Sequence, residues 1–98
     1  MLENYYENKL RTGVKKLGGG AMCLKFVSPG FTGVPDRLIL LPGAKLLFVE
    51  MKRPGKTERE RQKYVQGLLR KLGFEVFSSV DSQEKIDEVI NRCRELMA

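Results

Sequence analysis

The chain has 98 residues, of which 42% are hydrophobic and 31% charged, and its net charge is +6. These values are typical of a soluble globular protein with one domain, 1–98, and no apolar run approaches the roughly 18 residues of a membrane span. The sequence has no histidine, and Cys23 and Cys93 lack CxxC spacing, which argues against zinc fingers, disulfide scaffolds and histidine-based catalysis.

The first third of the chain predicts a helix and a strand. Apolar residues recur at spacings of three and four over residues 2–17, which is the pattern of one helix face. Three glycines at 18–20 end that helix, and AMCLKFVS at 21–28 predicts a strand. A loop rich in glycine and proline then leads to Asp36.

Two apolar runs at residues 37–41 and 46–52 form the clearest motif of the chain. The turn PGAK at 42–45 joins them, so that the three segments together predict a β-hairpin. Downstream, Thr57 followed by Glu60 is a capping-box pattern, which predicts the start of a second long helix.

The rest of the chain predicts a helix, a strand and a helix. The second helix extends to about residue 72 and carries an apolar stripe of Tyr64, Val65, Leu68, Leu69 and Leu72. FEVFSSV at 74–80 predicts a fourth strand, and Asp81 with Glu84 predicts the cap of a last helix that ends near residue 97. The order is α-β-β-β-α-β-α, in which the helix between the third and fourth strands is a crossover. We therefore expect those two strands to be parallel in a mixed sheet.

Positive charge is concentrated in the middle of the chain. Residues 51–71 carry eight Lys/Arg against two Asp/Glu, whereas residues 72–98 carry three against six. A basic block of this kind favours a polyanionic partner on one side of the protein.

The hairpin brings charged side chains together at its open end. A turn centred on residues 43–44 would place Asp36 opposite Met51, and a three-residue loop would place it opposite Glu50. Glu50 and Lys52 are two residues apart on one strand, so they share a face. Two neighbouring carboxylates repel each other unless a cation lies between them, and oxygen ligands favour Mg²⁺.

A carboxylate-bound Mg²⁺ next to a lysine is suited to phosphodiester hydrolysis, since the metal polarises the phosphoryl oxygen and acidifies a bound water. The alternative is purely structural: Asp36 caps a loop, and Glu50 and Lys52 form a solvated ion pair.

The pattern Pro35-Asp36…Glu50-Met51-Lys52 resembles the PD-(D/E)XK nuclease motif. Its setting, KFVSPGFTGVPDRLIL followed by LLFVEMKRPG, is similar to the VRR-NUC family, the virus-type replication-repair nuclease domain. The resemblance implies the α/β, restriction-endonuclease-like α-β-β-β-α-β-α fold, with a mixed four-stranded sheet flanked by helices.

The resemblance also implies roles for the residues of the hairpin. Asp36, Glu50 and the main-chain carbonyl of Met51 would bind Mg²⁺, for which Mn²⁺ could substitute, and Lys52 would assist the attacking water. No organic cofactor is implied.

A glutamate of the first helix completes the site in this family. Glu3 and Glu7 both qualify, because both share the face of the apolar stripe. Glu7 is favoured, with Glu3 as the alternative, because ENKL enters that stripe where the family's glutamate does. Gln62 matches a glutamine near the family's site. We interpret the glycine-rich loop 30–33 as a flexible wall of that site.

Basic residues around this centre are expected to hold DNA phosphates without reading the base sequence. They are Lys15, Lys16, Arg53, Lys56, Arg59, Arg61 and Lys63.

The resulting hypothesis is a cytoplasmic, phage- or bacterial-type endonuclease that acts in DNA repair as a homodimer on branched DNA such as Holliday junctions. The alternative from another functional class is a non-catalytic nucleic-acid-binding protein that retains the nuclease fold.

Overall fold

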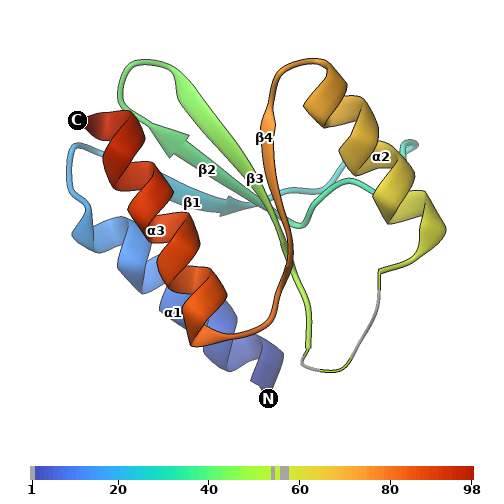
Figure 1. Ribbon diagram of the computed structural model, residues 1–98, viewed down its shortest axis with the longest axis horizontal. Helices are drawn as coiled ribbons and strands as arrows, with labels where there is room; N and C mark the ends of the chain where they lie inside the picture. The colour runs from blue at the N-terminus through green and yellow to red at the C-terminus, as the bar shows by residue number, and fades with distance from the viewer. Residues whose placement is uncertain (1, 54, 56–57) are drawn as a thin grey trace.

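Figure 1 shows the computed structural model, which describes residues 2–53, 55 and 58–98, with only the backbone described for residues 2–4. The described residues form three helices and four strands in the order expected from the sequence. These are α1 (Leu2–Lys16), β1 (Met22–Lys25), β2 (Arg37–Leu41), β3 (Lys45–Met51), α2 (Glu60–Lys71), β4 (Glu75–Val80) and α3 (Gln83–Met97). Within the described ranges, no helix is long and apolar enough to cross a membrane.

The strands form one mixed sheet in the order β1-β2-β3-β4. β1–β2 and β2–β3 are antiparallel, and β3–β4 are parallel, which confirms the crossover predicted for α2. Leu41 pairs with Lys45, so the hairpin turn is the three-residue loop 42–44. Gly43 and Ala44 adopt positive φ values of 80° and 61°, the left-handed conformation that such a tight loop requires.

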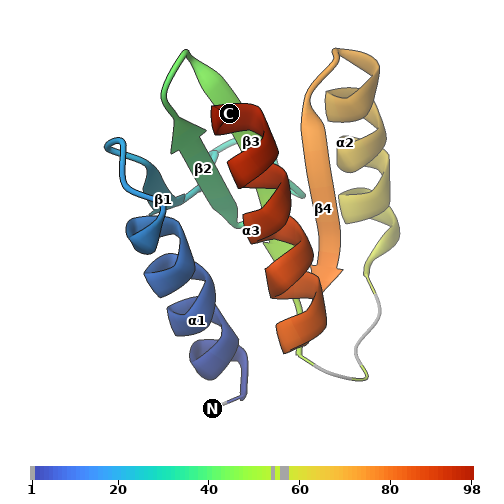
Figure 2. The same cartoon turned by 60° about the vertical axis from the view of Figure 1, so that its left-hand side comes forward.

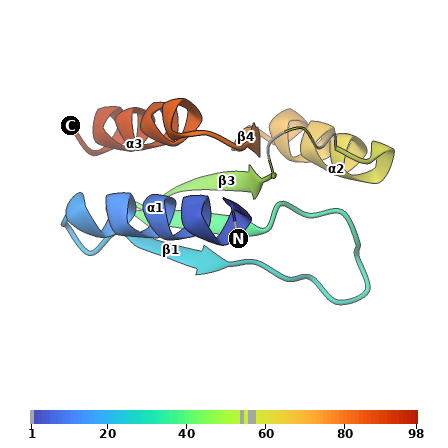
Figure 3. The same ribbon diagram turned by 90° about the horizontal axis from the view of Figure 1, so that it is seen from below.

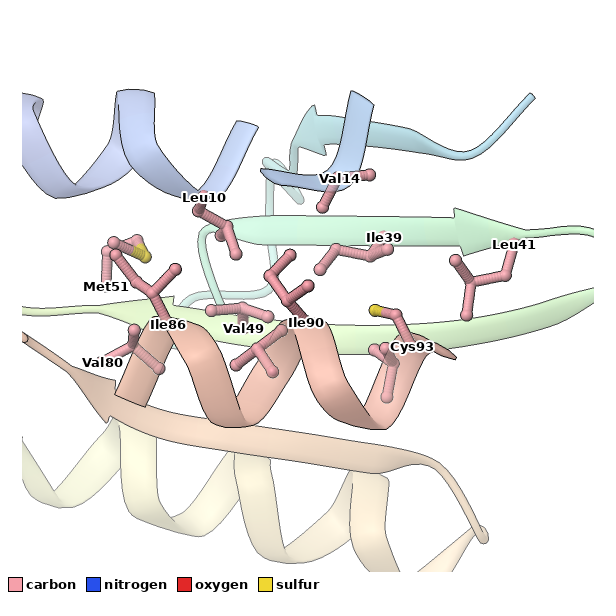
Figure 4. Close-up of a cluster of buried hydrophobic side chains, with 12 residues drawn as sticks. Leu10, Val14, Ile39, Leu41, Val49, Met51, Val80, Ile86, Ile90 and Cys93 are labelled. Carbon is pink, nitrogen blue, oxygen red and sulfur yellow. The ribbon is translucent and has the colours of Figure 1, made fainter. Parts of the chain in front are cut away.

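One face of the sheet carries the hydrophobic core. Figure 2 shows α1 and α3 side by side over this face. Alternate residues of β2 and β3 point toward these helices, and Figure 4 shows them in contact with side chains such as Leu10 of α1 and Ile90 of α3. Gly13 lets the two helices approach closely, because an added Cβ would lie 2.9 Å from Cδ1 of Ile90. This packing fixes the hairpin that carries the predicted metal ligands.

The opposite face of the sheet is only partly covered, by α2 packed along β4 (Figure 1). Phe48 lies at its centre, with the ring centroids of Phe26 and Phe74 at 5.8 Å and 5.5 Å. Met22 and Leu24 at the β1 edge are 48% and 38% exposed. Apolar side chains on this face therefore remain accessible to solvent.

Two helix starts, one helix face and the length of the first strand differ from the sequence-based expectation. β1 ends at Lys25, whereas the sequence predicted a strand to residue 28. The N-cap of α2 is Arg59, and the N-cap of α3 is Ser82, whose hydroxyl accepts from the backbone N–H of Lys85. Glu60 therefore opens α2 instead of closing a capping box, and Thr57 lies outside the described residues. Tyr64 and Leu72 were predicted in the apolar stripe but are 58% and 74% exposed, because α2 packs mainly along the edge strand β4.

Candidate metal centre

The open end of the hairpin brings Asp36 and Glu50 together. The register of β2 and β3, continued by one residue beyond the pair Arg37–Val49, places Asp36 opposite Glu50, as the three-residue loop predicts. Oδ1 of Asp36 accepts a hydrogen bond from the backbone N–H of Met51 at 3.0 Å. This bond fixes the aspartate carboxylate at the end of β3.

Gln62 connects two of the predicted site residues through its side-chain amide. Its Nε2 donates to Oε2 of Glu50 at 3.0 Å, and its Oε1 accepts from Nζ of Lys52 at 2.9 Å. The same Oε1 accepts from the backbone N–H of Arg59 at 3.0 Å. Because Gln62 is held at the first turn of α2, it positions both Glu50 and Lys52 relative to that helix.

Glu50 is the electrostatically unusual residue of the site. It is 4% exposed, and Oε1 is the single buried side-chain oxygen or nitrogen without a hydrogen-bond partner among the described residues. Burial, followed by the charge of Asp36, raises the pKa of Glu50 to about 7. The Lys52 ammonium, 3.7 Å from Oε2, opposes this rise but does not cancel it. A buried carboxylate of this kind favours a cation as neighbour.

A β-bulge lies directly beside Glu50. Val49 pairs with Phe77 and Met51 pairs with Val80, so β4 carries one residue more than β3 over this interval. Ser79, with φ of 53°, absorbs the extra residue. The backbone N–H of Lys52 then bonds to the carbonyl of Val80 at 3.0 Å. Bulges commonly redirect side chains next to functional sites, and this one terminates the pairing of β3 where its charged residues begin.

Glu7, predicted to complete the site, forms an ion pair with Arg37. Arg37 follows Asp36 directly and projects to the face covered by α1. Burial is the main cause of the raised pKa of Cys23, and the charges of Asp36 and Glu7 raise it further. These two charges rank below burial and the charges of Arg37 and Arg11 among the causes, and the direct partner of Glu7 is Arg37. The Glu3 side chain lies outside the described residues.

The sequence interpretation missed Arg37 and Glu58. Successive side chains of a strand point to opposite faces of the sheet. This alternation could have indicated that Arg37 points away from Asp36, toward the first helix. Glu58 accepts a hydrogen bond of 2.6 Å from Gln66, and its charge raises the pKa of Glu50. Gln66 lies among the apolar positions of α2 and is only 2% exposed. A buried polar side chain needs a hydrogen-bond partner, and this was the signal that could have indicated Glu58.

The predicted phosphate-binding residues occupy different parts of the surface. Arg53, Arg59 and Lys63 are exposed on the segment after β3 and on α2, close in sequence to Lys52 and Gln62. Lys15 and Lys16 are exposed at the other end of α1, eight and nine residues from Glu7, which is about 12 to 14 Å of helix. Arg61 bonds through Nε to the carbonyl of Thr32 at 3.0 Å. Lys56 lies outside the described residues.

The donor set fits a divalent cation in part. Within the described part of the chain, no group of three or more carboxylate, cysteine or histidine side chains is close enough to hold a metal. Asp36 and Glu50 provide two carboxylates, and Glu50 offers its unpartnered Oε1. A hard cation would complete its shell with water and main-chain oxygen, which is common for Mg²⁺. The residues present therefore fit a hydrated Mg²⁺ better than a fully protein-bound ion.

A mixed sheet with this hairpin and its Asp…Glu-x-Lys residues at the open end defines the PD-(D/E)XK class of nuclease folds. A solved structure described as a "VRR_NUC domain" matches with a TM-score of 0.70 and 27% identity, over 87% of this chain and 94% of that chain. "Putative nuclease p44" of Acyrthosiphon pisum secondary endosymbiont phage 1 is 44% identical over 82 residues, which are 84% of this chain and 85% of that protein. No model of a known protein family matches the sequence. The chain belongs to the VRR-NUC family.

Proposed function

We propose that this protein is a Mg²⁺-dependent endonuclease that hydrolyses DNA phosphodiester bonds. The observation that carries the proposal is the buried Glu50, with an unpartnered Oε1, between Asp36 and the Lys52–Gln62 hydrogen bond. The fold of the chain and its phage relative, "Putative nuclease p44", support the same class of activity.

Each residue of the centre has a chemical task in this proposal. Asp36, Glu50 and the main-chain carbonyl of Met51 would hold the cation, which supplies a Lewis acid for the phosphoryl oxygen when bound. The Lys52 ammonium, which Gln62 holds in place, would orient the attacking water and offset the negative charge that develops at the phosphate. Glu7 would complete the site by releasing Arg37 and accepting a hydrogen bond from a water molecule bound to the cation.

The exposed basic residues beside the centre would hold the phosphates on either side of the scissile bond. They act through charge and carry no base specificity, so that the shape of the DNA decides the substrate. We propose branched DNA, including four-way junctions, as the preferred shape.

A homodimer is part of the proposal. Met22, Leu24 and Phe74 remain exposed on the face that α2 leaves open. Pairing of two such faces would cover these side chains and present two metal centres to a branched substrate. Light scattering on the purified chain measures the mass directly, and a monomer at micromolar concentration would contradict this part.

The activity is tested with supercoiled plasmid and a labelled four-way junction, each incubated with Mg²⁺, Mn²⁺ or EDTA. We expect metal-dependent cleavage that falls at least about 1000-fold in Asp36→Ala, the scale set by loss of an essential charge-stabilising group. Asp87→Ala removes an exposed aspartate on α3 and is the matched control, which should cleave like the parent. Binding of the junction without metal-dependent cleavage would instead support the non-catalytic alternative.

Calorimetry separates the roles of the three motif residues. Asp36→Ala and Glu50→Ala should abolish Mg²⁺ binding, whereas Lys52→Ala should retain it and lose cleavage rate. Loss of Mg²⁺ binding in a folded Lys52→Ala protein would show that this division of roles is wrong.

A further inference from the structure

The loop between β1 and β2 is fixed onto the first turn of α2. Figure 3 shows it extending past the strands at the end of the sheet where α2 lies. Gly33, with φ of 91°, approaches α2 so closely that an added Cβ would lie 2.8 Å from Cγ of Arg61 and 3.1 Å from Cγ2 of Val65. Together with the bond from Arg61 to Thr32, this contact holds the neighbouring Phe31 in place.

Two aromatic rings flank the guanidinium of Arg61. Its Cζ lies 4.9 Å from the ring centroid of Phe31 and 5.5 Å from that of Tyr64. Phe31 and Tyr64 are nevertheless 44% and 58% exposed. We call Phe31, Arg61 and Tyr64 the stacking cluster. Exposed rings arranged around a cation are suited to flat, electron-rich ligands that follow a negatively charged backbone.

The stacking cluster and the metal centre both include residues of the first turns of α2. Arg61 and Tyr64 are three residues apart and share one face of α2, while Gln62, between them in sequence, contacts Glu50 and Lys52. Because successive residues are about 100° apart around a helix, Gln62 and Tyr64 point to different sides of α2, with Arg61 between them. A DNA strand that runs from the metal centre across Arg61 would bring a nearby nucleotide to the exposed rings.

From this arrangement we propose that the stacking cluster binds an unpaired nucleobase next to the scissile phosphate. Bases inside a duplex already stack on both faces, so only a base in a gap, bulge, flap or open branch point can stack on Phe31 or Tyr64. The site therefore prefers DNA with unpaired nucleotides over fully paired DNA. This inference rests on the proposed nuclease function and specifies its substrate.

Binding without metal tests the inference apart from catalysis. The probes are a fully paired duplex and the same duplex with a three-nucleotide gap that contains 2-aminopurine opposite the missing bases, both in EDTA. We expect the parent to bind the gapped DNA at least about tenfold more tightly, and to change the fluorescence of the 2-aminopurine by stacking. Equal affinity for the two probes would overturn the inference.

Substitutions test whether the aromatic rings cause the preference for gapped DNA. Tyr64→Ala should weaken binding of gapped DNA by about 5- to 100-fold, the range that corresponds to loss of one base–aromatic stack. Binding of paired DNA should not change, and Tyr64→Phe should behave like the parent. Leu72→Ala, which alters another exposed apolar residue just after α2, is the control. An equal loss for both probes in Tyr64→Ala would overturn the inference.

Plasmid cleavage distinguishes this inference from the proposed function. Metal-dependent cleavage together with equal binding of the two probes would refute the stacking cluster alone. Preference for the gapped probe without cleavage in Mg²⁺ or Mn²⁺ would refute the nuclease alone.

Discussion

The two ends of the β2–β3 hairpin are built for different purposes. At the turn end, Leu47 pairs with Ile39 and both are fully buried, so each contributes to the hydrophobic core. At the open end, Glu50 is also buried but keeps an unpartnered oxygen and a pKa of about 7. Burial at the turn end stabilises the fold, whereas burial at the open end costs free energy that a bound cation would recover.

The largest stability effect is expected from the turn end. Leu47→Ala should lower the free energy of unfolding by about 3 kcal/mol, because it removes buried contacts and leaves a cavity. Leu72→Ala makes the same chemical change at a residue that is 74% exposed and should stay within about 0.5 kcal/mol of the parent. Urea denaturation measures both. Similar losses in the two variants would contradict the location of the core.

A substitution at the open end should have the opposite sign. Burial raises the pKa of Glu50 from 4.5 to about 7, so its contribution to stability is greatest below pH 4.5 and is lost as the pH rises to 7. Glu50→Gln removes the charge and should stabilise the metal-free protein on the order of 2 kcal/mol at pH 8.

The pH dependence supplies the control for this prediction. The advantage of Glu50→Gln should shrink between pH 7 and pH 4.5, because the parent carboxyl is then protonated in the folded protein. Glu88→Gln changes an exposed residue of α3 and should show no such trend. Thermal unfolding at a series of pH values in EDTA measures the effect. A Glu50→Gln protein that is less stable than the parent at pH 8 would contradict the free-energy cost assigned to the buried carboxylate.

The smallest effect is expected at Gln62, which supports the open end without contributing a charge. Gln62→Ala removes the acceptor for Lys52 and the donor to Glu50, so single-turnover cleavage should slow about tenfold. Gln83→Ala, at the exposed start of α3, should leave the rate unchanged. A rate for Gln62→Ala equal to that of the parent would show that the bridge is dispensable.

The sequence predicted the elements of this fold because each signal was local. Alternation, apolar spacing and the glycine and proline turns lie within a few residues of the element that they determine. The proximity of Asp36, Glu50 and Lys52 also followed, because hairpin register propagates from a turn by simple counting.

The details that the sequence did not predict depend on contacts between distant segments. The exposure of Tyr64 follows from how α2 lies against β4, and the pairing of Glu7 with Arg37 follows from where α1 crosses the sheet. The choice of Arg59 over Thr57 as the start of α2 depends on the bond from its N–H to Gln62. Periodicity alone could not provide any of these.

The three-residue turn at 42–44 has a consequence for how this protein can change over time. Because it sets the register, it determines that Glu50 stands across from Asp36, five pairs of residues away. If one residue of this segment were deleted and the hairpin still closed through three loop residues, Leu41 would pair with Leu46, Met51 would stand across from Asp36, and the side chains of β3 would turn to the wrong face. The most exposed segment of the hairpin is therefore the one whose length cannot vary, although surface turns usually tolerate insertions and deletions.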